Sequence, residues 1–342
     1  MIEWFVQALE RKLDQSKDSP GGRSVVINAH NYSQRITLAI IMSVLYRRPN
    51  EVDFDVIDDF WTTSLSYTET QVLHPGAKVA SALPFLLPFV CWAMQFTFMG
   101  KLNGRINDYI EQYVERRQAA KKGVEGPKRG LLDGFIDALV EKKINKEQLI
   151  GSANFLILAG YETTAATITC LLWNLAQNID IQTKLREAII SEGIDANYVV
   201  WCIMETIRWH PPVPLGVGRV IGENITTNDG LFLPKGTFVM PSIYSIHHDE
   251  SIWPQHDKFM PERWRDSSKF HPAAFMGFGL GPRNCVGGKM AVHEIKLALK
   301  AILTRYQVAR CDASPKIYNF KSPGMLFTIP DEKVKLQLKP LR

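Results

Sequence analysis

The sequence contains little cysteine and no block of charge of one sign. Its five cysteines lie far apart and never form a CxxC pair, which argues against a disulfide framework and against a zinc cage. The 40 lysines and arginines and the 35 aspartates and glutamates leave a net charge of +5, spread along the chain. That distribution is not typical of nucleic-acid-binding proteins, so we expect no nucleic-acid partner.

Signals for targeting and for repetition are also missing. The first residues, MIEWFVQALERKLDQ, form an amphipathic helical pattern without a charged n-region or an apolar h-region, so we expect neither a signal peptide nor an N-terminal membrane anchor in this chain. No internal repeat or low-complexity tract is detectable. With 46% hydrophobic and 22% charged residues, the composition is that of a globular chain, which excludes disordered and collagen-like classes.

Apolar periodicity predicts a mainly helical first half. We expect helices over residues 1–13, 32–46, 52–65, 102–117 and 131–140, and no strand before residue 180. The basic, glycine-bearing segment 116–130 is predicted to be a solvated loop. From Val213 the pattern changes to short β-type runs separated by turns, such as GLFLPKGTFVMPS and MLFTIPDEKVKLQL. The sequence therefore predicts a mainly α protein with small β-sheets near its C-terminal half.

Two long apolar runs need to be weighed against a membrane interpretation. The run at 79–100 has no charged residue and is long enough to span a bilayer, but Pro84 and Pro88 weaken a continuous helix. We expect peripheral contact with a membrane interface there, with a spanning helix as the alternative. The run at 148–179 carries one charged side chain, Glu162, and we expect a buried core helix because a charge inside a membrane is costly.

The segment FMGFGLGPRNCVGGKM, residues 275–290, has a pattern suited to metal ligation. It does not complete GxGxxG, and Met290 follows the lysine where a phosphate loop needs Ser or Thr. Cys285 instead lies in a glycine-rich bend before an amphipathic helix predicted over about 288–305. A thiolate at a helix N-terminus is stabilised as an anion and suits an axial metal ligand. The other cysteines are interpreted as small buried hydrophobes; these are Cys91, Cys170, Cys202 and Cys311.

Two helical patterns place polar side chains among apolar ones. Glu205 and Arg208 are spaced i, i+3, so they can pair, and the apolar flanks in WCIMETIRWHPP favour a buried pair over a solvated one. Gly160 with Thr163 and Thr164 puts a notch without a side chain beside two hydroxyls, which can bond carbonyls of the preceding turn and bend the helix. A kinked core helix remains the alternative to a functional break.

Four segments, in order along the chain, resemble the cytochrome P450 signature. AGYETT at 159–164, ETIR at 205–208 and PERW at 261–264 are similar to three of its parts. The fourth part is the pattern F-x-x-G-x-R-x-C-x-G of the haem-binding loop, matched here by Phe278, Gly281, Arg283, Cys285 and Gly287. The chain is identified as a member of this family that resembles eukaryotic microsomal members and is shortened at the N-terminus.

The resemblance implies a fold and a cofactor. It implies one P450-like helical domain over 1–342 that lacks the usual N-terminal part, with a helical portion at 1–180 and a portion with the haem loop and small sheets at 181–342. It implies haem b, with Cys285 as the axial ligand of the iron. Arg283 and Arg219 match positions whose guanidinium groups bind haem propionates. Phe278, Gly281 and Gly287 would complete the cofactor-binding loop.

The resemblance also implies roles for the other matched residues. Thr163 would hydrogen-bond bound dioxygen, and Glu162 would relay protons toward it. Glu205, Arg208 and Arg263 would form a structural network beneath the haem loop, without a catalytic role.

The activity implied is that of a haem-thiolate monooxygenase. It would insert one oxygen atom from O2 into a lipophilic small molecule and take electrons from a reductase. A truncated, inactive relative and a haem-thiolate isomerase are the alternatives. For a eukaryotic protein the resemblance implies the cytoplasmic face of the endoplasmic reticulum membrane. The candidates for an apolar substrate wall are Val213, Leu215, Val217, Leu326 and Phe327.

One face of the helix after Cys285 is basic. Lys289, His293, Lys296 and Lys300 recur at helical spacing, while apolar residues line the opposite side. We interpret this stripe as a docking face for an acidic electron donor, with a solvated helix face as the equal alternative.

Overall fold

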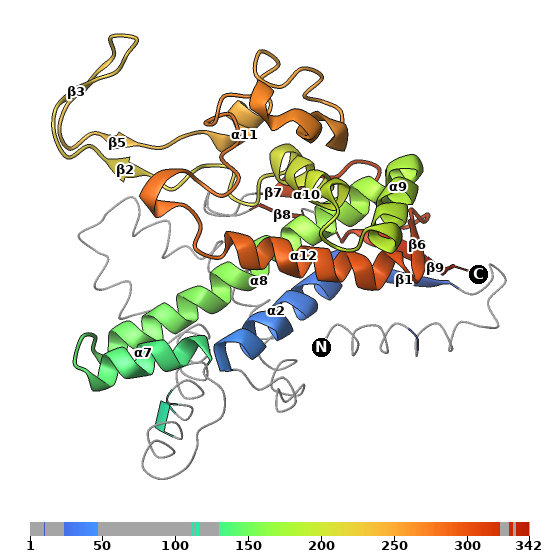
Figure 1. The fold of residues 1–342 in the computed structure, drawn as a ribbon, viewed down its shortest axis with the longest axis horizontal. Coiled ribbons are helices and arrows are strands. Elements are labelled where there is room, and N and C mark those ends of the chain that lie inside the picture. Colours follow the sequence, from blue (N-terminus) through green and yellow to red (C-terminus); the bar gives the residue numbers. More distant parts are fainter. Residues whose placement is uncertain are drawn as a thin grey trace. The chain divides into compact units, whose positions relative to one another are not determined.

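The computed structural model describes residues 10, 24–46, 111, 114–115, 130–321, 328–330 and 333–341. Within these residues the chain is mainly helical with four small antiparallel sheets, which confirms the predicted fold class (Figure 1). The chain divides into two compact units, one formed by Met1 and 31–165 and the other by 2–30 and 166–342. Helices α2 and α8 each contribute residues to both units.

The helices in the described residues are α2 (Ala29–Tyr46), α7 (Leu131–Val140), α8 (Lys146–Gln177), α9 (Ile179–Ser191), α10 (Asn197–Trp209), α11 (Ile243–His247) and α12 (Gly288–Leu303). Two 3-10 segments, η2 (Pro261–Lys269) and η3 (Gly281–Arg283), precede α12. The expected helix at 131–140 is confirmed, and the one expected at 32–46 begins three residues earlier. The helices expected at 1–13, 52–65 and 102–117 and the loop at 116–130 lie largely or wholly outside the described residues.

In the first unit, the helices pack through apolar side chains and through hydrogen bonds. A Cβ atom at Gly160 would lie 2.9 Å from Cδ1 of Ile41, so the glycine allows α2 and α8 to approach closely. The Thr37 hydroxyl donates a hydrogen bond to the backbone carbonyl of Tyr161 at 2.9 Å. Fully buried apolar side chains fill the interior of this unit, among them Leu38, Leu45, Leu132, Ile136 and Leu149.

Helix α8 was expected to be a core helix. Among the described residues it is the one helix long and apolar enough to cross a membrane by length and composition, and 67% of its most apolar window is buried inside the protein. A long, mostly buried helix of this kind also occurs at the centre of soluble proteins. Its burial supports the core-helix interpretation.

The second unit contains a three-stranded antiparallel sheet in the order β1 (Val25–Asn28), β9 (Lys335–Pro340) and β6 (Tyr306–Ala309). The sequence-based expectation of no strand before residue 180 is wrong at β1. Four residues are too few to establish a period, and β1 is a strand because it pairs with β9 from the far end of the chain. Gln182 of α9 extends the edge of this sheet, since its side-chain amide exchanges two hydrogen bonds with the backbone of Val308, each 2.9 Å long.

Most of the β-type runs expected after Val213 form short strand pairs, and two of these pairs lie along one long hairpin. Strands β2 (Arg219–Val220) and β5 (Phe238–Val239) pair with each other, as do β3 (Ile225–Thr226) and β4 (Phe232–Leu233). This long hairpin extends away from α10 and α12 (Figure 1). Its apolar side chains are largely exposed, including Val220 at 65% and Phe238 at 63%. A further short pair joins β7 (Phe320–Lys321) to β8 (Ile329–Pro330).

Helix α12 carries a buried carboxyl group at Glu294. The residue is 2% exposed, and neither carboxylate oxygen has a hydrogen-bond partner among the residues that the structure describes. Desolvation raises the pKa of Glu294 to about 8. The apolar stripe expected on this helix is buried beside it, with Ile295, Leu299 and Ile302 each 1% exposed.

We therefore expect Glu294 to destabilise the fold as the pH rises. Its pKa in the folded state lies above the ordinary value of 4.5, so the stability present below pH 4.5 is lost progressively as the pH rises toward about 8. Glu294→Gln removes the ionisation, so its stability relative to the native chain should rise by about 3 kcal/mol between pH 5 and pH 8. Urea unfolding at the two pH values measures the difference. Glu192→Gln, at an exposed glutamate, is the control, and a gain in both variants or in neither would contradict the assignment.

Candidate functional site

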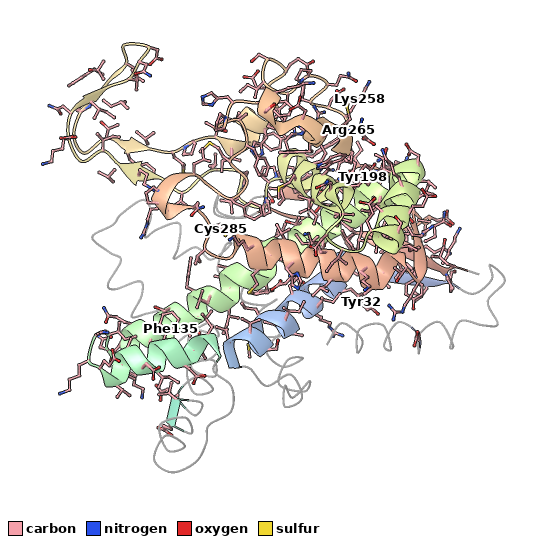
Figure 2. All side chains as sticks on the ribbon, in the orientation of Figure 1. Tyr32, Phe135, Tyr198, Lys258, Arg265 and Cys285 are labelled. Atoms are coloured by element: carbon pink, nitrogen blue, oxygen red, sulfur yellow. The ribbon has the colours of Figure 1, made fainter. Side chains whose placement is uncertain are left out.

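The loop that carries Cys285 is shaped by glycines in the left-handed region. Gly279 and Gly281 have φ angles of +69° and +73°, a conformation that a side chain disfavours. The backbone N–H of Cys285 donates a hydrogen bond to the carbonyl of Phe278 at 2.8 Å, which closes the bend. Figure 2 shows Cys285 just before the first turn of α12, the position that the sequence pattern predicts.

The sulfur of Cys285 is open to solvent. The residue is exposed and its thiol is not in a disulfide. A Cβ atom at Gly287 would lie 4.0 Å from Sγ of Cys285, so this glycine leaves space beside the thiol. The Phe278 ring packs against the next residue, Gly288. This bend presents an uncovered soft donor at the N-terminal end of a helix.

The two arginines expected near this loop are both exposed. Arg283 makes no hydrogen bond or ion pair with any residue that the structure describes. Arg219 folds back on the residues just before β2, where Nη1 donates to the carbonyls of Val217 and Gly218 at 3.0 and 2.9 Å. Both guanidinium groups therefore lack a carboxylate partner among the described residues.

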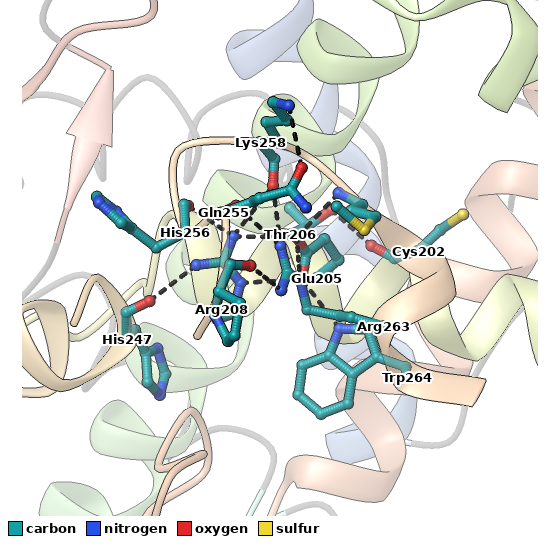
Figure 3. A network of polar contacts seen from close by, with 12 residues as sticks. Cys202, Glu205, Thr206, Arg208, His247, Gln255, His256, Lys258, Arg263 and Trp264 are labelled. Carbon is teal, nitrogen blue, oxygen red and sulfur yellow. Dashed lines mark hydrogen bonds and ion pairs between the residues drawn. The ribbon is translucent and has the colours of Figure 1, made fainter. Parts of the chain in front are cut away.

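Glu205 and Arg208 form a fully buried ion pair on α10 (Figure 3). Arg208 donates from Nε and Nη2 to the two carboxylate oxygens of Glu205, at 2.9 and 3.0 Å. Arg263, from η2, donates from Nε to the same carboxylate at 3.0 Å. The structure thus brings together the three residues that the sequence grouped.

Further hydrogen bonds surround the pair. The Glu205 carboxylate also accepts from the backbone N–H of Met260 at 2.9 Å and from the indole N–H of Trp264 at 3.0 Å. Arg208 donates to the backbone carbonyls of His247 and His256 at 2.8 and 3.0 Å. A buried ion pair needs such additional partners to offset the cost of desolvation. The sequence reasoning missed Met260, Trp264 and His247 as members of this network, although Trp264 belongs to the PERW segment.

Thr163 and Glu162 lie on α8, in the first unit. The Thr163 hydroxyl donates to the carbonyl of Ala159 at 2.8 Å, which is the back-bond to the preceding turn that the sequence predicted. Glu162 is 1% exposed and accepts a hydrogen bond from Nε2 of Gln34 at 2.9 Å. The notch at Gly160 is filled by the side chain of Ile41.

The remaining expectations concern an apolar run, one cysteine and the candidates for a substrate wall. Leu326, Phe327, Cys91 and the run at 79–100 lie outside the described residues. Of the other candidates for a substrate wall, Val213 and Leu215 are half-buried, and Val217 is 68% exposed.

Two of the cysteines interpreted as hydrophobes, Cys170 and Cys202, are buried, and burial raises the pKa of both thiols. Cys311 is only half-buried, so its description as a buried hydrophobe is wrong. It lies in a turn at the surface, where its backbone N–H donates to the Ser314 hydroxyl at 2.9 Å.

Comparison with known proteins identifies the family. The family model for cytochrome P450 matches residues 1–338. Cytochrome P450 3A12 of Canis lupus familiaris is 30% identical over 212 residues, covering 58% of this chain and 41% of that protein. Cytochrome P450 4A6 of Oryctolagus cuniculus is 33% identical over 207 residues, or 57% and 38% of the two chains. Leukotriene-B4 omega-hydroxylase 3 of Mus musculus is 33% identical over 193 residues, or 51% and 36%.

The chain belongs to the cytochrome P450 family. The region matched spans about two fifths of the length of these curated relatives. Proteins of this family use haem, whose iron is held by one cysteine thiolate.

The residues of the Cys285 loop fit such a group. An exposed, unpaired thiol at a helix N-terminus has the chemistry of the single protein ligand that this kind of iron needs. No cluster of three or more His, Cys, Asp or Glu side chains able to hold a metal ion occurs in the described part of the chain. A porphyrin supplies the other ligands itself, so one thiolate suffices. The exposed guanidinium of Arg283 has the donor geometry for a propionate.

We expect the buried network to dominate the stability of the second unit. Glu205→Gln leaves Arg208 buried without its counter-charge and should cost about 3–5 kcal/mol in the free energy of unfolding. Glu262→Gln is a matched control, because Glu262 forms an ion pair with Lys184 whose two side chains are 36% and 49% exposed. The control should cost less than about 1 kcal/mol. Urea unfolding followed by far-UV circular dichroism gives both values. Equal losses in the two variants would contradict the greater contribution that we expect from the buried network.

Proposed function

We propose that this protein is a haem-thiolate monooxygenase. It inserts one oxygen atom from O2 into a lipophilic small molecule and takes the electrons from a reductase. The observation that carries the proposal is the exposed thiol of Cys285, held ahead of α12 on a loop with the family's haem-binding pattern. The name of the mouse relative, an omega-hydroxylase, supports oxygen insertion as the chemistry.

The cofactor of this proposal is haem b, whose iron the Cys285 thiolate would hold. When bound, haem supplies the activation of O2 and the transfer of one oxygen atom to the substrate. The chain supplies the thiolate, whose negative charge is stabilised by the backbone N–H groups at the start of α12. Arg283 and Arg219 bind the propionates through guanidinium groups that have no carboxylate partner among the described residues. Phe278, Gly281 and Gly287 keep the loop in shape around the sulfur.

Thr163 and Glu162 handle protons in this proposal. The Thr163 hydroxyl is oriented by its bond to Ala159, and the buried Glu162 carboxylate is held by Gln34. A hydroxyl and a buried carboxylate are the kinds of group that deliver protons by acid–base catalysis. Their assignment rests on the family resemblance.

The electron donor docks on the exposed basic residues of α12. Lys289, His293 and Lys300 are exposed, and they present positive charge to an acidic partner. Lys296 contributes less, because its side chain is 12% exposed and its ammonium group donates to Asp195 at 2.9 Å. We place the protein at the cytoplasmic face of the endoplasmic reticulum membrane in a eukaryotic cell, with residues 79–100 in peripheral contact with lipid.

We expect Cys285→Ser to abolish the thiolate spectrum. The haem-reconstituted native chain, reduced under carbon monoxide, should give a Soret band at the position typical of thiolate ligation, and the serine variant should not, because its hydroxyl is a far weaker ligand. Cys311→Ser is the matched control and should keep the band. A thiolate band in Cys285→Ser, or none in the folded native chain, would exclude the proposed function. Incorporation of labelled O2 into product separates a monooxygenase from an isomerase, whose product carries no label.

Charge reversal on α12 should weaken coupling to the reductase. The double variant Lys289→Glu, Lys300→Glu should lower reductase-supported turnover about tenfold at low ionic strength, with a smaller loss at high salt because exposed charges are screened. Turnover driven by an organic hydroperoxide, which needs no electron donor, should stay unchanged. Lys235→Glu, at an exposed lysine of the hairpin, controls for net charge. Equal loss of the reductase-supported and the hydroperoxide-driven turnover would point to a folding defect and contradict the docking face.

A further inference from the structure

The loop of Cys285 begins at three consecutive residues, Phe275, Met276 and Gly277, and each is fixed by a different contact. A Cβ atom at Gly277 would lie 2.3 Å from Cγ2 of Ile207, so the loop backbone runs directly against α10. Ile207 lies in the chain between Glu205 and Arg208. The start of the loop therefore rests on the helix that carries the buried ion pair.

His247 holds Phe275 and Met276 through its imidazole ring. The residue is 0% exposed, and its ring stacks on the Phe275 ring at a centroid distance of 5.2 Å and an interplanar angle of 2°. The backbone N–H of Met276 donates a hydrogen bond to Nε2 of His247 at 3.0 Å. One side chain thus fixes both the position of an aromatic ring and a backbone N–H of the loop.

The backbone of His247 is in turn tied to the ion pair. Its carbonyl accepts a hydrogen bond from Nη1 of Arg208 at 2.8 Å, which Figure 3 shows as a dashed line. The Trp264 ring also lies edge-on to the Phe275 ring, at a centroid distance of 5.0 Å and an angle of 83°, and its indole N–H donates a hydrogen bond to Glu205. Phe275 therefore contacts two side chains, and each belongs to a residue that bonds one partner of the pair.

We propose that His247 is the positioning residue of the Cys285 loop. It connects Arg208 to the backbone at Met276 and so fixes where the loop presents the sulfur of Cys285. This role deepens the proposed function and rests on it, because the position of the sulfur matters most if Cys285 binds iron. His247 itself touches neither the sulfur nor a reacting atom, and it acts through the loop.

The protonation state of His247 suits this role. Burial, helped by the nearby charge of Arg208, lowers the pKa of His247 to about 3. The imidazole is therefore neutral at physiological pH, and Nε2 remains a hydrogen-bond acceptor for Met276. In a protonated imidazole Nε2 would carry a proton and could not accept the hydrogen bond from the backbone N–H of Met276.

Two substitutions separate the hydrogen bond from the packing. His247→Phe keeps an aromatic ring to stack on Phe275 but removes the acceptor, whereas His247→Gln removes the ring and keeps an acceptor oxygen. His248→Asn is the matched control, because the adjacent His248 stacks on Tyr244 and bonds its carbonyl, and makes no contact with the loop that the structure describes. All variants are made in the full chain.

The first readout is hydrogen exchange at the Met276 amide, which does not require cofactor. Loss of its acceptor should speed exchange about tenfold in His247→Phe, in line with the net strength of one buried hydrogen bond. The second readout is the reduced carbon monoxide spectrum after haem reconstitution. In His247→Phe part of the thiolate-type band should move to the position of weaker ligation, and His247→Gln should recover most of it.

The outcomes distinguish the two proposals. Faster exchange and a shifted band in His247→Phe, both recovered in His247→Gln and absent in His248→Asn, support the positioning role. Exchange and band equal to those of the native chain in His247→Phe would overturn it, as would equal loss in the Phe and Gln variants. If the native chain gives no thiolate-type band, the proposed function fails, while the exchange rate at Met276 still decides whether His247 holds the loop.

Discussion

The second unit depends on one buried ion pair. Glu205 and Arg208 are fully excluded from solvent, so their charges depend there on the hydrogen bonds that surround them. Their partners come from α11, from the segment before η2 and from η2 itself. Because the pair must keep these partners, it fixes the paths of segments that would otherwise be irregular loops. The cysteine loop follows soon after those segments in the chain, and in our proposal the charge pair positions this loop through His247 without touching Cys285.

The buried ion pair could be predicted from the sequence. Its long-range contacts and strand β1 could not, for physical reasons. The i, i+3 spacing and apolar flanks of Glu205 and Arg208 predict a buried pair, because a local helix is enough to bring them together. The contacts of Arg208 with His247 and of Trp264 with Glu205 span 39 and 59 positions, and no local pattern encodes them. Strand β1 was missed for the same reason, since pairing with a distant strand makes it a strand. The proposed roles of Thr163 and Glu162 rest on family resemblance, because the bond of Thr163 to Ala159 and that of Glu162 to Gln34 would suit a core helix equally well.

The chain also carries polar groups that contribute nothing to the network. Glu294 is buried at the centre of α12 with no hydrogen-bond partner among the described residues, unlike Glu205, which accepts five hydrogen bonds from four residues. The contrast illustrates a general rule: burial determines the cost of a charge, and the number of partners determines whether the cost is met. Two glutamates of similar burial in one unit therefore have opposite effects on its stability.

The hairpin formed by β2, β3, β4 and β5 has a practical consequence. Each paired region has only two strands, so both outer edges have backbone groups free of any described strand, and the faces bear Val220 and Phe238 in contact with water. Unpaired edges beside apolar side chains favour self-association at high protein concentration. This hairpin, more than the helical part of the same unit, should consequently limit solubility during purification. Detergent or dilution should improve solubility by reducing association through the hairpin.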